Sequence, residues 1–241
     1  MFFRQLLYED AACISYCVGC PSKGVVAIID PQTDIEQYLS ISKQHNLKIT
    51  HIIETHVQAD HLSGAHMLSR ASSAPVYYHR DAQVTFSHRN LEDGEILQIG
   101  NRKIRIIHTP GHTNDSMTLL VDDWFILTGD TLFVGDVGRV DLSLEDDPKE
   151  VPKKAGRLYD SLFHKLLALP DYIEVYPGHF SGSSCGKNMD GKPISTIGRE
   201  KRNNHVLQIC SRDRFITMMM QHISPPLNYK KIKRVNMGLA R

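Results

Sequence analysis

Four short segments rich in histidine and aspartate hold the residues of this chain that are suited to metal chemistry. Imidazole and carboxylate groups together are ligands of borderline or hard divalent metals such as zinc and iron. A lone histidine or Gly-Asp pair in a loop is usually an ordinary surface or turn residue, whereas four such segments together predict a metal centre. The segments are Thr55-His56-Val57-Gln58-Ala59-Asp60-His61, Thr109-Pro110-Gly111-His112-Thr113, Thr128-Gly129-Asp130-Thr131 and Tyr176-Pro177-Gly178-His179.

Each of the four segments lies at or just after the end of a predicted strand. Apolar and β-branched runs predict the strands, and apolar residues at helical spacing predict the helices. Loops at strand ends present reactive groups on a rigid scaffold, and a glycine beside a ligand lets the backbone turn sharply. Strands are predicted at 24–31, 49–55, 75–78, 96–100, 103–108, 116–121, 124–128 and 173–177. Helices are predicted at 33–46 and 152–169, and 65–70 is predicted as the start of another helix.

The C-terminal quarter differs in composition from the rest of the chain. Residues 181–193 form a loop rich in glycine and serine, and helices are predicted at 197–211 and 213–222. The basic end, with Lys230, Lys231, Lys233 and Arg234, is interpreted as a solvated terminus rather than a nucleic-acid patch. Strands alternating with helices and followed by a helical tail indicate an α/β or α+β layered domain. We therefore expect one domain over 1–241, with 181–241 as a loop plus helical extension.

Composition and charge argue against several classes of function. The chain has 241 residues, is 41% hydrophobic and 23% charged, and carries a net charge of +1. It is long enough to bury a core without disulfide or metal staples. The charge balance gives no reason to expect nucleic acid or an anionic membrane as partner, and no run approaches the roughly 18 apolar residues of a membrane span. The acidic start and the absence of a signal segment predict a cytoplasmic protein.

Cysteine usage agrees with a reducing compartment. Five cysteines are an odd number, so a disulfide framework is not expected. Cys13, Cys17 and Cys20 are close enough in sequence to suggest a metal cluster, but they lie in a predicted strand and turn. We interpret them as buried, reduced thiols.

The order of the four segments resembles the metallo-β-lactamase superfamily. Its first motif is Thr-His-x-His-x-Asp-His, followed by a Gly-His, a Gly-Asp and a final Gly-His. The resemblance covers roughly residues 10–180, and its one departure is Gln58, which stands where the motif has its second histidine. It implies an α+β fold of the αββα type, with two mixed β-sheets face to face, helices outside, and the site at one edge between them.

The resemblance also implies the metal ligands. In dinuclear members the first metal site would use His56, His112 and Asp130 together with an imidazole that Gln58 does not provide. Two histidines and one carboxylate with open positions favour one non-haem Fe(II) per chain, with zinc as the alternative. The other residues of the motifs either support this metal site from outside or hold a second metal ion. These residues are Gln58, Asp60, His61 and His179.

One branch of the superfamily, the persulfide dioxygenases, uses such a mononuclear iron site. Arg139 and Asp141, in the segment Gly135-Asp136-Val137-Gly138-Arg139-Val140-Asp141-Leu142, resemble that branch's Gly-Arg-x-Asp, and residues 191–200 resemble its C-terminal segment. Arg139 and Asp141 are therefore predicted to bind substrate, although Arg139 could instead pair with Asp141 or Asp136 to pin the loop. A guanidinium suits a carboxylate or a sulfur anion.

The function implied is oxidation of glutathione persulfide, or a similar low-molecular-weight thiol persulfide, by O₂ to sulfite and thiol. This would place the protein in sulfur metabolism and sulfide detoxification. No residue is required as a covalent nucleophile, and Cys185 is a conceivable persulfide carrier. The resemblance is compatible with a homodimer.

Two other functions fit the same residues. One is a glyoxalase II-like hydroxyacylglutathione thioester hydrolase with a zinc or mixed-metal site, in which a metal-bound hydroxide attacks the acyl carbon. The other is a non-catalytic relative that uses the fold for binding. Metal content separates the three hypotheses.

Overall fold

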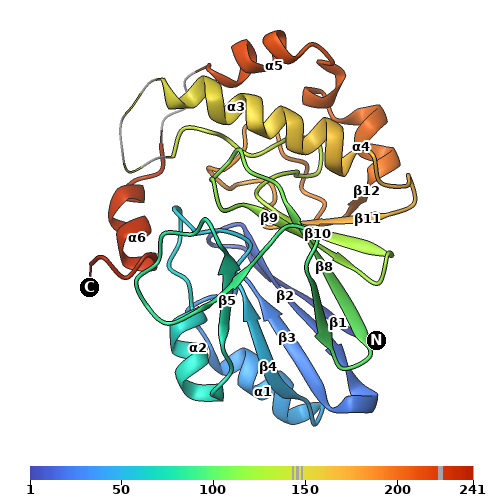
Figure 1. The fold of residues 1–241 in the computed structure, drawn as a ribbon, viewed down its shortest axis with the longest axis vertical. Coiled ribbons are helices and arrows are strands. Elements are labelled where there is room, and N and C mark those ends of the chain that lie inside the picture. The colour runs from blue at the N-terminus through green and yellow to red at the C-terminus, as the bar shows by residue number, and fades with distance from the viewer. Residues whose placement is uncertain (143, 145–146, 148, 222–224, 241) are drawn as a thin grey trace.

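The computed structural model describes residues 1–142, 144, 147, 149–221 and 225–240. Two six-stranded mixed sheets lie face to face, and helices cover their outer sides (Figure 1). This confirms the predicted α+β sandwich. Among the described residues, no helix is long and apolar enough to cross a membrane.

The first sheet is built from the N-terminal part of the chain and has the strand order β1-β2-β3-β4-β5-β6. β1, β2 and β3 are antiparallel, whereas β3 to β6 run parallel to one another. Helices α1 and α2 follow β3 and β4 in the chain and lie at the lower end of the view in Figure 1. The elements are β1 (Phe2–Tyr8), β2 (Cys13–Cys20), β3 (Val25–Ile29), α1 (Glu36–Gln44), β4 (Lys48–Ile53), α2 (Ala65–Ser72), β5 (Val76–His79) and β6 (Arg89–Leu91).

The second sheet has the order β12-β11-β10-β9-β8-β7. Its pairs are antiparallel except β10 with β11, which are parallel because α3 connects them across the outer face. A π-helical turn extends α3 at its C-terminal end. The elements are β7 (Ile96–Ile99), β8 (Arg102–His108), β9 (Met117–Val121), β10 (Phe125–Gly129), α3 (Glu150–Ser161), the π-helical turn (Leu162–Leu166), β11 (Glu174–Pro177) and β12 (Ser195–Thr196).

The main core lies between the two sheets. β2 buries Ile14, Tyr16 and Val18, and β8 contributes Ile104 and Ile106 from the opposite sheet. Both sets repeat every second residue, as expected for strands that turn one face to a core. The predicted hairpins at 96–108 and 116–128 form as β7–β8 and β9–β10.

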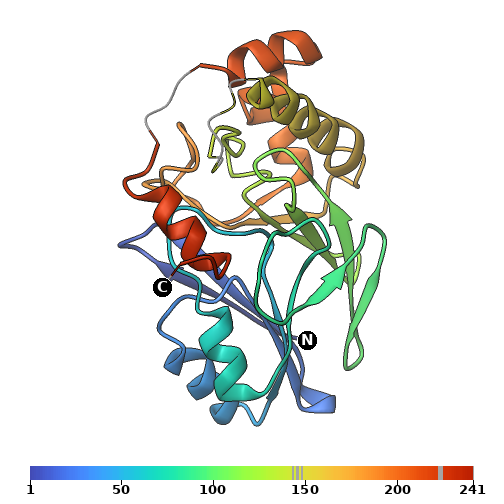
Figure 2. The same ribbon diagram turned by 60° about the vertical axis from the view of Figure 1, so that its left-hand side comes forward.

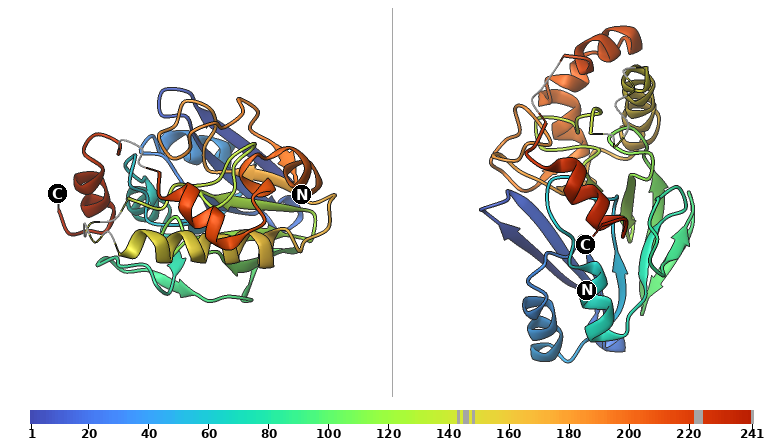
Figure 3. Two further views of the ribbon diagram at one scale, coloured as in Figure 1. Left: turned by 90° about the horizontal axis from the view of Figure 1, so that it is seen from above. Right: turned by 90° about the vertical axis from the view of Figure 1, so that its left-hand side faces the viewer.

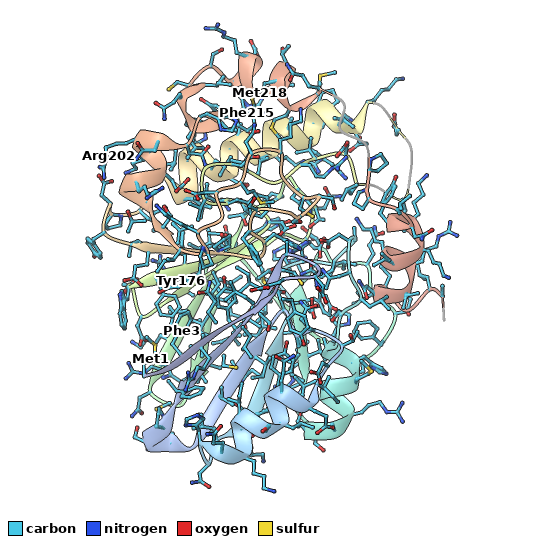
Figure 4. All side chains as sticks on the ribbon, turned by 180° about the vertical axis from the view of Figure 1, so that it is seen from behind. Met1, Phe3, Tyr176, Arg202, Phe215 and Met218 are labelled. Atoms are coloured by element: carbon cyan, nitrogen blue, oxygen red, sulfur yellow. The ribbon has the colours of Figure 1, made fainter. Side chains whose placement is uncertain are left out.

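Aromatic contacts join the sheets at the end that carries the N-terminus. Phe3 of β1 meets Tyr176 of β11 edge to face, with ring centroids 4.9 Å apart (Figure 4). The Tyr16 hydroxyl donates a hydrogen bond to the carbonyl oxygen of Pro177 at 2.5 Å. β1 was not predicted from the sequence, yet it covers this edge of the core.

The C-terminal part departs from the sequence prediction. The helix predicted at 197–211 is α4 (Ile197–Asn203) followed by a 3-10 turn (Val206–Gln208). The helix predicted at 213–222 is α5 (Arg212–Met219), and residue 222 lies outside the described residues. Phe215 and Met218 of α5 lie over α3 in Figure 4, and α3 and α5 share one apolar cluster.

The basic end is solvated only in part: Lys231 and Arg234 are exposed, whereas Lys230 and Lys233 are half-buried. Residues there form the helix α6 (Tyr229–Asn236), which lies apart from α5 and against loops of the first sheet (Figures 2 and 3). Asn236 and the following Met237 are buried. Because an eight-residue helix is marginal alone, this tertiary anchoring is what stabilises it.

Glycine at position 138 is a packing requirement that we can test. A Cβ atom there would lie 1.8 Å from the carbonyl oxygen of Asp130 and 3.3 Å from Cβ of His112. We expect Gly138→Ala to lower the free energy of unfolding by about 1–3 kcal/mol or more, since overpacking forces backbone shifts. Thermal and denaturant unfolding measure this. Gly191→Ala is the control, because a Cβ there meets nothing within 4 Å; equal losses in the two variants would contradict the expectation.

Candidate metal centre

The predicted ligand residues meet at one edge of the two facing sheets. His56 follows β4, His112 follows β8, Asp130 follows β10 and His179 follows β11. All four side chains are buried. The structure thus brings together residues separated by up to 123 positions, as expected when strands from two sheets end at the same edge.

His56, His112 and Asp130 form the first set of candidate ligands. Oδ2 of Asp130 lies 3.8 Å from Nε2 of His56 and 3.6 Å from Nε2 of His112. All three atoms are buried and have no hydrogen-bond partner among the described residues. Unpaired buried polar atoms are costly, so three that face one another indicate a site that is built for a cation.

The other ring nitrogens are held so that Nε2 faces the centre. Nδ1 of His112 donates to the carbonyl oxygen of Arg139 at 2.7 Å. Nδ1 of His56 lies 3.0 Å from Oγ1 of Thr55, whose hydroxyl donates to Asp30, so this nitrogen is the donor. Burial lowers the pKa of His56 to about 4 and also lowers the pKa of His112. Both rings are therefore neutral at pH 7 and offer a lone pair to a metal.

The second predicted group forms a series of close polar contacts next to this set. His179 donates through Nδ1 to Oδ1 of Asp130 at 2.7 Å, and its Nε2 lies 2.8 Å from Oδ2 of Asp60. Oδ1 of Asp60 is 3.0 Å from Nδ1 of His61. Burial opposes the charged form of His179, but Asp130 and Asp60 raise its pKa well above the ordinary value.

Gln58 is also buried, and its Oε1 has no hydrogen-bond partner among the described residues. A carboxamide oxygen is a weaker ligand for zinc than an imidazole nitrogen. The position that the family motif gives to histidine therefore offers a neutral oxygen here.

Arg139 pairs with Asp141, which is one of the two arrangements weighed from the sequence. Nε and Nη2 of Arg139 donate to the two carboxylate oxygens at 2.6 and 2.8 Å, and Nη1 donates to the carbonyl oxygen of Ser184. Asp136 instead accepts backbone N–H groups from the 186–188 loop. Arg139 and Asp141 line a cavity of about 230 Å³ together with Met218 and Met219.

Two further residues lie at the site: Cys185, which the sequence suggested only as a conceivable persulfide carrier, and one residue that the sequence did not suggest. Cys185 is 1% exposed, and its sulfur lies within 4.8 Å of ligand atoms of Asp130 and His179. Burial raises its pKa well above the ordinary value, so its thiol is protonated. The other residue is Asn236 of α6.

Asn236 ties α6 to the loop that bears Gln58 and His61. Its Nδ2 donates to the carbonyl oxygens of Gln58 at 2.9 Å and His61 at 2.8 Å, and its Oδ1 accepts the N–H of Ser63. No motif in the sequence signals these contacts, because the partners are more than 170 residues apart.

Comparison with known proteins identifies the class. The family model of the Metallo-beta-lactamase superfamily matches residues 12–179, and the chain belongs to this superfamily. A metallo-beta-lactamase from Staphylococcus aureus has a similar structure, with 30% identity and a TM-score of 0.89 over 98% of this chain and 72% of that chain.

More specific relatives fall into two groups. The mitochondrial persulfide dioxygenase of Bos taurus is 25% identical over 91% of this chain and 80% of its own length. ETHE1 from Myxococcus xanthus is 28% identical, with a TM-score of 0.86 over 99% of this chain and 100% of that chain. A hydroxyacylglutathione hydrolase of Dictyostelium discoideum is 30% identical over 68% of this chain, and the match spans 61% of that relative.

The contacts of Asn236 predict a role in holding the metal-binding loop. We expect Asn236→Ala to weaken Co(II) or Fe(II) binding by about 10- to 100-fold, since outer groups that orient ligands have effects of this size. Metal titration of the apoprotein measures the affinity. Asn203→Ala, at an exposed site on α4, should leave it unchanged. Equal metal affinity in the Asn236 variant and the wild type would show that α6 does not support the loop.

Proposed function

We propose that this chain is a mononuclear non-haem iron persulfide dioxygenase, with one Fe(II) per chain, that acts in the cytoplasm. Glutathione persulfide, O₂ and water would give glutathione, sulfite and two protons. The substrate could also be another low-molecular-weight thiol persulfide, and Arg139 and Asp141 would contact it.

The use of the two oxygens of Asp130 carries this proposal. Oδ2 faces His56 and His112, whereas Oδ1 accepts the hydrogen bond from His179. A carboxylate used in this way offers one oxygen to an ion that lies near the two imidazoles. Two imidazoles and one carboxylate with open positions are the ligand set of non-haem Fe(II) oxygenases.

Each group of residues then has a separate task. When bound, the iron would supply the electrons and the adjacent binding positions that let O₂ react with a persulfide sulfur. The iron would be held by His56, His112 and Asp130. His179, which also contacts Asp60, would fix the orientation of the Asp130 carboxylate. Burial of these side chains excludes bulk water from the reacting sulfur.

The extent of the comparisons also supports this function. The similarity to the dioxygenase of Bos taurus and to ETHE1 from Myxococcus xanthus extends over nine tenths or more of this chain. The similarity to the Dictyostelium hydrolase covers about two thirds of this chain.

A glyoxalase II-like thioester hydrolase is the second candidate, and one observation favours it. Asp60, His61 and His179 have ligand atoms within 4.8 Å of one another, which is compatible with a second metal position. With zinc in that position, a metal-bound hydroxide would be available for attack on a thioester.

Metal analysis and oxygen uptake separate the two candidates. We expect anaerobically purified protein to contain one iron per chain, to consume O₂ when glutathione persulfide is added, and to release sulfite. Asp130→Ala should abolish both iron binding and O₂ uptake, because it removes the only carboxylate of the ligand set. Asp213→Ala, on an exposed face of α5, serves as the control. About two zinc ions per chain, no O₂ uptake and hydrolysis of an acylglutathione would instead establish the hydrolase.

A further inference from the structure

A cluster of two histidines and one aspartate lies outside the candidate metal centre, between strands of different sheets. His79 ends β5 of the first sheet, Asp81 follows it in the loop, and His108 ends β8 of the second sheet. One potential ligand atom of each residue lies within 4.8 Å of those of the other two. We call these three residues the intersheet cluster. Two imidazoles and one carboxylate are suitable ligands for a borderline divalent metal.

The distances within the intersheet cluster are close to those around one bound ion. Oδ2 of Asp81 lies 3.7 Å from Nδ1 of His79 and 3.8 Å from Nε2 of His108, and both distances are too long for hydrogen bonds. Bonds of about 2.0–2.1 Å place two ligand atoms of a tetrahedral zinc ion about 3.4 Å apart. The carboxylate oxygen is therefore only about 0.3–0.4 Å too far from each imidazole nitrogen to share an ion with it.

His79 offers the cluster a neutral imidazole. The residue is 3% exposed, and burial, together with the nearby His108, lowers its pKa. Its Nδ1 accepts the N–H of Asp81 at 3.3 Å, so this nitrogen carries the lone pair. A neutral ring with its lone pair on the side of the carboxylate is the form of histidine that binds a metal.

The ring of His108 is stacked on that of His79, with centroids 3.7 Å apart and planes inclined by 13°. Nε2 of His108 donates a hydrogen bond to the carbonyl oxygen of Asn114 at 2.8 Å. A metal ion would bind the other tautomer, in which Nδ1 holds the proton and Nε2 the lone pair. Both rings would then tilt from the stack toward the ion, and the carbonyl oxygen of Asn114 would lie beside it as a further oxygen ligand.

The backbone of His108 is fixed independently of its ring. Its N–H donates to Oδ1 of Asp93 at 2.8 Å, and its carbonyl oxygen accepts a hydrogen bond from Nζ of Lys165 at 2.7 Å. Because Lys165 is paired with Asp93 at 3.0 Å, its charge is compensated beside a cation. The side chain of Asp81 is 48% exposed, which gives an ion a path from solvent to the cluster.

We propose that His79, Asp81 and His108 form a separate metal site that binds Zn(II) or a similar borderline divalent ion. The ion would tie β5 of the first sheet to β8 of the second. His108 precedes the candidate ligand His112 by four residues, so the ion would also restrain the loop that carries His112. The site uses none of the residues assigned to the candidate metal centre, and it therefore does not depend on the proposed function.

Zinc content after equilibrium dialysis against buffered micromolar Zn(II) tests the assignment. We expect the wild type to hold one zinc ion per chain more than Asp81→Asn and His108→Gln. Losing a ligand should weaken binding by more than the roughly 10- to 100-fold that an outer partner contributes. The candidate metal centre adds the same number of ions to each protein, because its ligands are unchanged. Zn(II) should also raise the unfolding temperature of the wild type more than that of either variant.

The matched control is His164→Gln. Nδ1 of His164 also lies 3.7 Å from an aspartate oxygen, that of Asp160, but no third ligand among the described residues completes a cluster there. This variant should bind as much zinc as the wild type. Equal zinc contents in the wild type, Asp81→Asn and His108→Gln would overturn the site, and so would a loss of the same size in His164→Gln. Unfolding temperatures without zinc verify that each variant is folded, and Asp81→Asn, at an exposed position, keeps the test decisive if His108→Gln does not fold.

Discussion

The candidate site depends on a buried carboxylate whose two oxygens have different partners. One oxygen of Asp130 is satisfied by His179, and the other faces His56 and His112 with no hydrogen bond from the described residues. Although burial alone would raise the pKa of Asp130, the neighbouring histidines lower it below the ordinary value. The carboxylate is therefore a permanent negative charge inside the protein, and the surrounding fold has to compensate it.

Close backbone approach around this carboxylate explains the glycines of the motifs. Gly129 adopts φ +49°, which turns the chain out of β10, and a Cβ there would collide with Thr55. At Gly178 a Cβ would lie 2.7 Å from Oδ1 of Asp130, where the hydrogen bond from His179 has to form. Strands of both sheets end close to one another at this edge. Small residues are therefore required where the loops that follow these strands approach one another.

Local sequence patterns predicted the parts of the molecule that local chemistry determines. Hairpins at 96–108 and 116–128 and the ligand-bearing loops follow from strand periodicity and turn residues. β6, with only three residues, and β1, whose residues are mostly half-buried, lack a strong pattern. The basic composition of α6 suggested solvent, and only the burial of Asn236 and Met237 against loops far away in sequence makes it a helix.

The difference between local sequence patterns and contacts distant in sequence also explains which site residues could be predicted. His56, His112 and Asp130 belong to motifs whose spacing carries information, whereas Lys233 and Asn236 act through contacts with residues 91 to 178 positions away. α6 carries both residues: Asn236 holds the loop of Gln58, and Lys233, one turn earlier, lines a cavity together with Val57 and Thr113. A change in this helix would therefore act on the loop of Gln58 and on the wall of this cavity together. Separating the two effects requires measuring metal affinity and KM on the same variants, since a loss of activity alone would not tell which contact had failed.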